Sequence, residues 1–150
     1  MSYHSSHHFG VFQCAFRIWN TSTLARFLHG YSLSFDVTFE ADKLNERGLV
    51  VDIEPLDHLR FVIEKKFHYK TLVASDDPDL EWFLDADTMG VLRTVQMPQV
   101  GLEHFSCWLA VSATDELMEN GWLDQVRVYS ARVNQVEYYP WESNTGKQSR

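Results

Sequence analysis

Residues 28–39 read LHGYSLSFDVTF, and this stretch carries the clearest structural signal of the chain. Leu33, Phe35 and Val37 occupy alternate positions in it, with polar residues between them. Because successive side chains of a strand point to opposite faces, the alternation predicts a strand with one buried face and one polar face. Residues 8–19 alternate in the same way. We therefore expect two long strands in one antiparallel sheet.

Two later segments change from the strand pattern to a helical one. Apolar residues recur at spacings of three and four over residues 56–67, which predicts an amphipathic helix. Pro55 suits its first turn, with Asp52 or Glu54 as the cap. Residues 101–119 show a similar spacing and predict a second long helix.

The remaining elements are shorter. Strands that outnumber two non-alternating helices indicate an α+β domain in which both helices cover one face of an antiparallel sheet. We interpret residues 1–150 as a single domain with an ordered core of about 8–139, a polar N-terminal lead and a loose polar tail. The other expected elements are short strands at 49–53 and 91–97, a short helix within 75–89, and a strand or hairpin over 125–139.

Composition excludes several classes of protein. The 150 residues carry 13 Lys and Arg against 21 Asp and Glu, a formal charge of −8, so binding to nucleic acid through phosphate charge is not expected. No apolar run approaches the roughly 20 residues that cross a bilayer, and the polar start does not resemble a signal peptide. Cys14 and Cys107 lie in apolar segments, where we expect small buried side chains. We predict a cytoplasmic protein without membrane contact.

Several stretches match motifs of one known family in the expected order. Residues 27–32, FLHGYS, are similar to a Leu-His-Gly-His segment that opens a second strand, and residues 12–17, FQCAFR, to a first strand ending in Ala-Ala-His-Arg. Further similar stretches are residues 48–53 (GLVVDI), 67–72 (FHYKTL), 101–103 (GLE) and 126–129 (VRVY). Together they resemble the family of 6-pyruvoyltetrahydropterin and 6-carboxytetrahydropterin synthases.

The resemblance implies a T-fold, an antiparallel sheet backed by two helices that assembles into an oligomeric barrel with active sites between subunits. In this family three His side chains hold a zinc ion, which leaves a fourth position for the substrate. A Cys and a nearby Asp–His pair move protons, and a Glu of the last strand anchors the pterin ring.

At the metal positions the resemblance carries over only in part. The first ligand position is Phe16, which cannot bind a metal. The second is His29, which is retained. The third is Tyr31, a poor ligand unless it is ionised, and its reference pKa of about 10 makes ionisation costly.

The proton-transfer and ring-binding positions also depart from the family pattern. The Cys position falls at Ala25, and the ring-anchoring Glu falls at Ser130. The Asp–His pair falls at His68 and Tyr69, which either form a repurposed acid/base pair or simply end a helix. Glu103 opens the second long helix and either caps it or contacts a ligand.

Two further groups of residues contain side chains that can bind a metal. The N-terminal histidines His4, His7 and His8 either replace lost zinc ligands or form a flexible polar lead. The acidic stretch 76–87 offers oxygen ligands, but it lacks the residue spacing of a calcium loop and is better interpreted as a solvated face.

Two functional hypotheses follow. The first is a homo-oligomeric relative of the pterin synthases that has lost the zinc site and catalytic residues, needs no cofactor, and acts as a scaffold or binds a pterin-like molecule. Its ligand-binding candidates are His29, Tyr31 and Glu103. The alternative is an active lyase of tetrahydropterin or 7-deazaguanine (queuosine) synthesis, with zinc and a rebuilt site that uses His68 and Tyr69. Fold alone does not decide between them.

Overall fold

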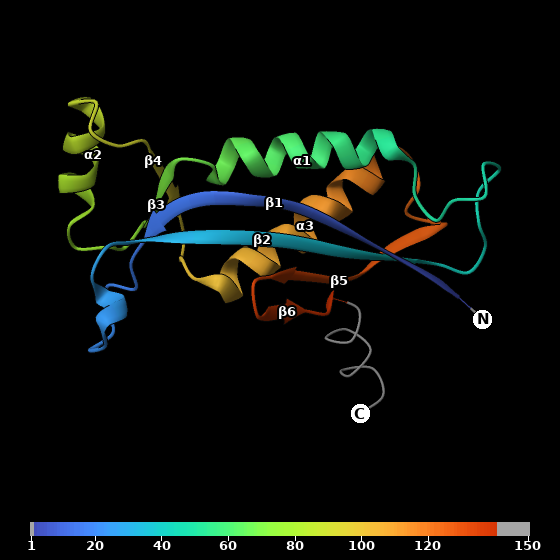
Figure 1. Ribbon diagram of the computed structural model, residues 1–150, viewed down its shortest axis with the longest axis horizontal. Coiled ribbons are helices and arrows are strands. Elements are labelled where there is room, and N and C mark those ends of the chain that lie inside the picture. Colours follow the sequence, from blue (N-terminus) through green and yellow to red (C-terminus); the bar gives the residue numbers. More distant parts are fainter. Residues whose placement is uncertain (1, 141–150) are drawn as a thin grey trace.

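The computed structural model describes residues 2–140, which build one six-stranded sheet with helices packed against it (Figure 1). The order of strands across the sheet is β4-β3-β1-β2-β5-β6. The strands are β1 (Tyr3–Phe16), β2 (His29–Ala41), β3 (Lys70–Ala74), β4 (Thr94–Met97), β5 (Val126–Val133) and β6 (Val136–Tyr138). The helices are the short 3₁₀ turn η1 (Leu24–Arg26), α1 (Ile53–Phe67), α2 (Leu80–Thr88) and α3 (Leu102–Glu119).

The two long strands pair as the alternating pattern predicts. β1 and β2 are antiparallel, β5 continues the antiparallel pairing beside β2, and β6 completes a hairpin with β5. The predicted α+β class is confirmed. The sheet is mixed, however, because β3 pairs in parallel with both β1 and β4. The sequence pattern predicts no strand at β3, because its residues KTLVA are mostly buried and do not alternate.

The core lies between the sheet and the two long helices, which share one cluster of buried side chains with the inner face of the strands. Phe67 of α1 stands at its centre, with its ring centroid 5.0 Å from that of Phe35 and 5.1 Å from that of Phe105 in α3. The prediction that both long helices pack on one face of the sheet is therefore confirmed. α2 lies apart from them, beyond the β3 and β4 end of the sheet (Figure 1).

A bulge in β1 keeps its apolar residues on the core face. The pairing with β2 shifts register between Phe9 and Phe12, and Gly10 sits in the shift with φ of 114°. A Cβ atom at Gly10 would lie only 2.9 Å from the backbone oxygen of Leu33. Only glycine fits this close approach, because the extra residue of a bulge brings two backbones together.

Two boundary predictions are wrong. The expected polar lead is part of β1, which begins at Tyr3 and places His4, His7 and His8 in the pairing with β2. The expected strand at 49–53 is a loop, and α1 begins at Ile53.

The start of α1 differs in detail from the capping prediction. Asp52 occupies the N-cap position, but its carboxylate accepts hydrogen bonds from Asn45 and Arg47 instead of capping the helix. The predicted loose tail is Pro140 and residues 141–150, and the latter lie outside the described part of the chain. No helix among residues 2–140 is long and apolar enough to cross a membrane.

Candidate functional site

The three positions that the resemblance assigns to metal ligands come together at one end of the sheet. Phe16 at the end of β1 pairs with His29 at the start of β2, and Cys14 pairs with Tyr31. Because directly opposed residues of an antiparallel pair point to the same face, all four side chains share the face that carries α3. We call Cys14, Phe16, His29 and Tyr31 the aromatic cluster.

Phe16 fills the centre of the aromatic cluster. Its ring stacks on that of Tyr31, with centroids 3.9 Å apart and an interplanar angle of 14°. On its other side it meets the edge of Phe105 at 5.1 Å. Phe16 is fully buried and therefore part of the hydrophobic core.

The polar groups of the aromatic cluster are held in their neutral forms. Burial, and to a lesser extent the nearby Cys14, raise the pKa of Tyr31. Burial raises the pKa of the Cys14 thiol to about 12. Neither phenolate nor thiolate is thus the dominant form at neutral pH, and both anions are the metal-binding forms of these side chains.

His29 is the one exposed member of the aromatic cluster. Its Nδ1 lies 2.6 Å from the carbonyl oxygen of Phe27. Since a carbonyl oxygen only accepts, Nδ1 carries the proton and donates this bond, which leaves Nε2 as an acceptor. The His29 ring also lies 4.5 Å from the ring of Tyr31. Of the three metal positions, His29 alone offers a neutral nitrogen ligand.

His68 and Tyr69 occupy the turn between α1 and β3. Their ring centroids are 4.3 Å apart. The backbone N–H of Gln13 donates to His68 Nδ1 at 3.2 Å, and the N–H of Tyr69 donates to the carbonyl oxygen of Gln13 at 2.7 Å. Gln13 is followed directly by Cys14 of the aromatic cluster, and Cys14 and Tyr69 line one cavity of about 290 Å³. The His68 and Tyr69 pair therefore adjoins the Cys14 end of the aromatic cluster, whereas Phe16 lies roughly 10 Å further along β1 from Gln13.

The other predicted positions are also spread out. Ala25 lies in η1, and Ser130 is buried in β5 opposite Thr38. Glu103 is exposed in the first turn of α3, where a carboxylate is stabilised by the helix dipole. A cavity of about 130 Å³ beside this helix start is lined by His104 and not by Glu103.

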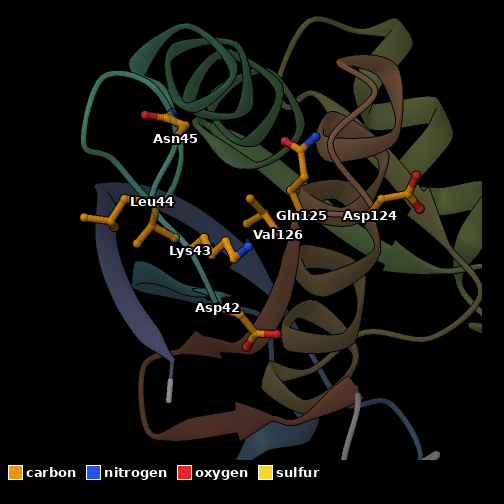
Figure 2. Close-up of a pocket in the computed structure, with 8 residues that line it drawn as sticks. Asp42, Lys43, Leu44, Asn45, Asp124, Gln125 and Val126 are labelled. Atoms are coloured by element: carbon orange, nitrogen blue, oxygen red, sulfur yellow. The ribbon is translucent and has the colours of Figure 1, made fainter.

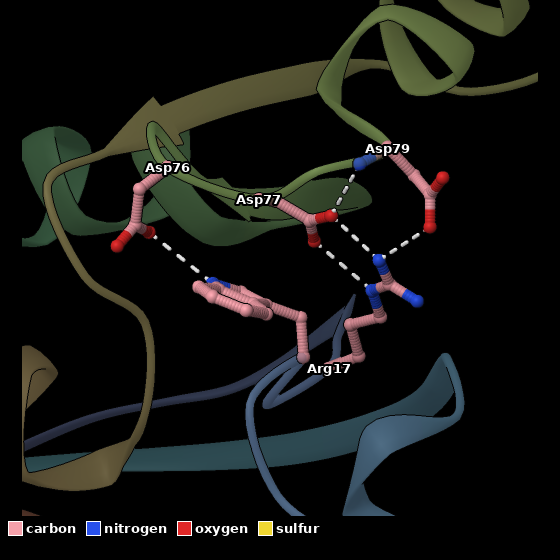
Figure 3. A network of polar contacts seen from close by, with 5 residues as sticks. Arg17, Asp76, Asp77 and Asp79 are labelled. Atoms are coloured by element: carbon pink, nitrogen blue, oxygen red, sulfur yellow. Dashed lines mark hydrogen bonds and ion pairs between the residues drawn. The ribbon is translucent and has the colours of Figure 1, made fainter.

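A polar network that no sequence motif predicts lies near the aromatic cluster. Arg17, one residue after Phe16, donates two hydrogen bonds to Asp77, at 2.9 Å and 2.5 Å, and a third to Asp79 at 2.8 Å (Figure 3). The side chain of Asp77 is only 2% exposed. Burial by itself raises the pKa of Asp77, but the hydrogen bonds and charge of Arg17 outweigh it and hold the pKa below its ordinary value.

The prediction that the acidic stretch is a solvated face holds for Asp76, Asp79, Glu81 and Asp85, which are exposed, and is wrong for Asp77. Asp76 accepts a hydrogen bond from the indole N–H of Trp19 at 3.2 Å, and Asp77 is ion-paired and buried. The carboxylates tie the segment after β3 to the segment after β1. A sequence signal did exist, because Arg17 ends the motif-like stretch 12–17, but its partner lies 60 residues away.

A large cavity lies at the opposite end of the sheet. It has a volume of about 410 Å³ and is formed by the loop after β2 and the segment before β5, where Lys43, Asn45 and Gln125 line it (Figure 2). β2 runs from His29 to Ala41, so this cavity is roughly 40 Å from the aromatic cluster. None of the predicted site residues lines it. The large cavity and the predicted site residues thus lie at different ends of the molecule. We place the candidate functional site at the aromatic cluster, because the residues of the family motifs lie there.

Comparisons with known proteins agree on one fold. An uncharacterized protein from Wolinella succinogenes superposes with a TM-score of 0.80 at 17% identity, covering 93% of this chain and 99% of that chain. The 6-pyruvoyl tetrahydropterin synthase of Plasmodium falciparum gives a TM-score of 0.65 at 12% identity, covering 92% of this chain and 98% of the enzyme. The enzyme of Caenorhabditis elegans gives 0.58 at 12% identity, covering 93% and 94%. No curated protein matches the sequence.

The structural likenesses confirm the predicted T-fold. The family follows from the sequence itself, because the model of the 6-pyruvoyl tetrahydropterin synthase family matches residues 7–140, which is nearly the whole described chain. The chain therefore belongs to the 6-pyruvoyl tetrahydropterin synthase family.

Proposed function

We propose that this protein is a family member without the family's zinc ion and lyase chemistry, and that it acts as an oligomeric scaffold or binds a pterin-like molecule. The observation that carries the proposal is the stacking of Phe16 on Tyr31 at two of the three metal positions. A phenyl ring has no lone pair to donate, and the raised pKa of Tyr31 disfavours the phenolate that a metal needs. With His29 alone left, the residues present do not fit the zinc ion of the family.

The proton-transfer positions support the same proposal. Ala25 has no thiol. Cys14 is the one cysteine of the aromatic cluster, and the pKa of its thiol is raised to about 12. A thiol that remains protonated at neutral pH is a poor base and a poor nucleophile. His68 uses its Nδ1 to accept a backbone N–H, so this nitrogen is occupied by a structural bond.

A ligand-binding surface nevertheless remains at the aromatic cluster. His29 presents a free Nε2 acceptor to solvent beside the ring of Tyr31. A flat heterocycle with N–H donors, such as a pterin, suits an imidazole acceptor next to an aromatic ring. Glu103 offers a further acceptor at the start of α3.

We infer a homo-oligomer from the edges and the polar face of the sheet. β4 and β6 are the outer strands of the sheet, and an edge strand leaves backbone N–H and C=O groups to pair with another chain. The face opposite the helices carries cross-strand polar pairs, including His8 with Asp36 at 3.0 Å and Gln13 with Ser32 at 2.9 Å. Such a face suits the wet interior of a barrel. The cytoplasmic location remains a prediction from the cysteine content.

The test is an assay of purified, untagged protein with dihydroneopterin triphosphate, with and without added zinc, combined with binding of the same compound by calorimetry. We expect no turnover in either condition. For a ligand-binding role we expect measurable binding that His29→Ala weakens about tenfold, whereas a scaffold role predicts no binding. An exposed-surface control is Glu64→Gln on α1, which should change neither result.

Turnover would overturn the proposal. If the double substitution His68→Ala with Tyr69→Phe then abolished this turnover, the alternative hypothesis of an active lyase with a rebuilt site would be correct. Light scattering on the same sample tests the assembly, and a monomer at micromolar concentration would contradict the proposed oligomer.

A further inference from the structure

A group of metal-ligating side chains lies where α1 crosses α3, away from the aromatic cluster. His58 of α1 faces Glu116 and Glu119 of α3. Glu116 is 13 residues after Glu103 on the same helix, which places it roughly 20 Å along the helix axis from the predicted pterin side. This group therefore has no part in the function proposed above.

The geometry of the group is already close to that of a metal site. One ligand atom from each of the three residues lies within 4.8 Å of the other two. His58 Nδ1 and Glu116 Oε1 are 2.5 Å apart. Ligands of a tetrahedral zinc ion, each about 2.1 Å from the metal, are about 3.4 Å from one another. Small side-chain rotations would convert the present hydrogen-bonded arrangement into a coordinating one.

Among residues 2–140, neither carboxylate forms an ion pair with a lysine or an arginine, and His58 is the ion-pair partner of Glu116. Both glutamates lie near the C-terminal end of α3, where the helix dipole is negative, and the last turn has no basic residue. They are also spaced at i and i+3, where like charges repel. The side chain of Glu116 is only 9% exposed, and its ion-pair partner His58 is 56% exposed. Glu119 takes part in no ion pair among residues 2–140.

We propose that His58, Glu116 and Glu119 form a binding site for a divalent transition metal of the zinc type. A cation there would neutralise the charge of the buried carboxylate and reduce the repulsion between the two glutamates. It would also interact favourably with the negative end of the helix dipole. An imidazole with two carboxylates suits Zn²⁺ and its neighbours better than Ca²⁺ or Mg²⁺, which prefer sets of oxygen ligands. Three protein ligands and an exposed His58 leave further coordination positions open to solvent.

The test is calorimetry of chelator-treated, untagged full-length protein with Zn²⁺ alone, repeated with Co²⁺ to record the visible spectrum of the bound ion. We expect about one ion per chain at this site. His58→Ala and Glu119→Gln should each weaken binding by about tenfold or more. Both replaced side chains are exposed, so these variants should fold even if a Glu116 variant does not. Zinc should raise the thermal midpoint of the wild-type protein and not that of His58→Ala.

Matched controls use the same residue types elsewhere on the same helices. His104→Ala on α3 and Glu64→Gln on α1 should bind zinc as the wild type does. Unchanged zinc binding in His58→Ala and Glu119→Gln would overturn the proposal, and so would binding that only His29→Ala removes. The latter result would also count against the proposed loss of the family's zinc site, whereas loss of binding in His58→Ala alone leaves that proposal intact.

Discussion

The ring of Phe16 stacks on the ring of Tyr31 across β1 and β2, with the centroids 3.9 Å apart. Neither of these neighbours on the sheet offers a metal a good ligand atom at neutral pH. The pair instead joins the aromatic cluster to the core, since Phe16 also packs against Phe105. The positions that the resemblance assigns to metal ligands are thus packed against the core in this structure, and such packing contributes stability.

The first prediction restores the ligands. Phe16→His combined with Tyr31→His would place two new imidazoles beside His29, in the register that pairs these positions. We expect this double variant to bind zinc at these three positions more tightly than the wild type does, as measured by calorimetry or by the spectrum of bound cobalt. We also expect a loss of about 3 kcal/mol in the free energy of unfolding without metal, because Phe16 is buried.

The gain must depend on His29. Adding His29→Ala to the double variant should remove the new zinc binding, while adding His58→Ala should leave it. If the double variant folds but binds no more zinc than the wild type, the three positions do not converge as the structure describes.

Much of the fold was predictable because its long elements carry their own periodicity. β2 and α3 alternate or repeat over many residues, so their type follows from local burial. β3 is too short and too evenly buried for such a pattern. Its identity depends on parallel pairing with β1 and β4, which are far away in the sequence. The start of β1 was missed because its polar residues lie in a strand that β2 stabilises through pairing.

The candidate site was predictable only as a list of positions. The resemblance assigned Phe16, His29 and Tyr31 to one set of metal positions, and the structure places their rings next to one another. It did not reveal the ion pair of Arg17 with Asp77 or the contact of His58 with Glu116. These contacts join residues about 60 positions apart through packing of whole elements, and no local pattern encodes such a distance.

A second prediction concerns pH. The pKa of Asp77 is lowered in the folded protein, so the ion pair with Arg17 contributes stability above the unfolded value of 3.8 and loses it as the pH falls through the folded pKa. Asp77→Asn should therefore lower the free energy of unfolding by about 2 kcal/mol at pH 7. Denaturant titrations should show this difference shrinking as the pH falls below 3.8.

Asp85 provides the control for this pH effect, because it is an exposed carboxylate on α2. Asp85→Asn should change stability by less than about 0.5 kcal/mol at every pH. A constant difference between the wild type and Asp77→Asn from pH 7 to pH 3 would refute the assigned role of the ion pair.

A third prediction tests the bulge. Gly10→Ala would bring a methyl group within 2.9 Å of the Leu33 carbonyl oxygen at a φ of 114°, so we expect a loss of about 3 kcal/mol in the free energy of unfolding. Gly90→Ala is the matched control, since Gly90 also has a positive φ, 79°, but open space around it. It should cost only about 1 kcal/mol. Equal losses in chemical denaturation would mean that the close approach at Gly10 does not exist.

The last prediction concerns the thiol of the aromatic cluster. Cys14 is buried, and the pKa of its thiol is raised to about 12. At pH 8 the ionised fraction of this thiol is therefore on the order of 10³-fold smaller than that of a free cysteine. Cys107 is partly exposed and serves as the internal comparison. Iodoacetamide followed by peptide mass spectrometry should label Cys107 in the native protein and label Cys14 at a comparable rate only in denaturant. The double variant Phe16→His with Tyr31→His should accelerate native labelling of Cys14, because the stacked rings that shield it are replaced by smaller polar ones. Rapid labelling of Cys14 in the native wild-type protein would show that reagents reach this thiol. It would contradict the assignment of Cys14 as a buried, unreactive side chain.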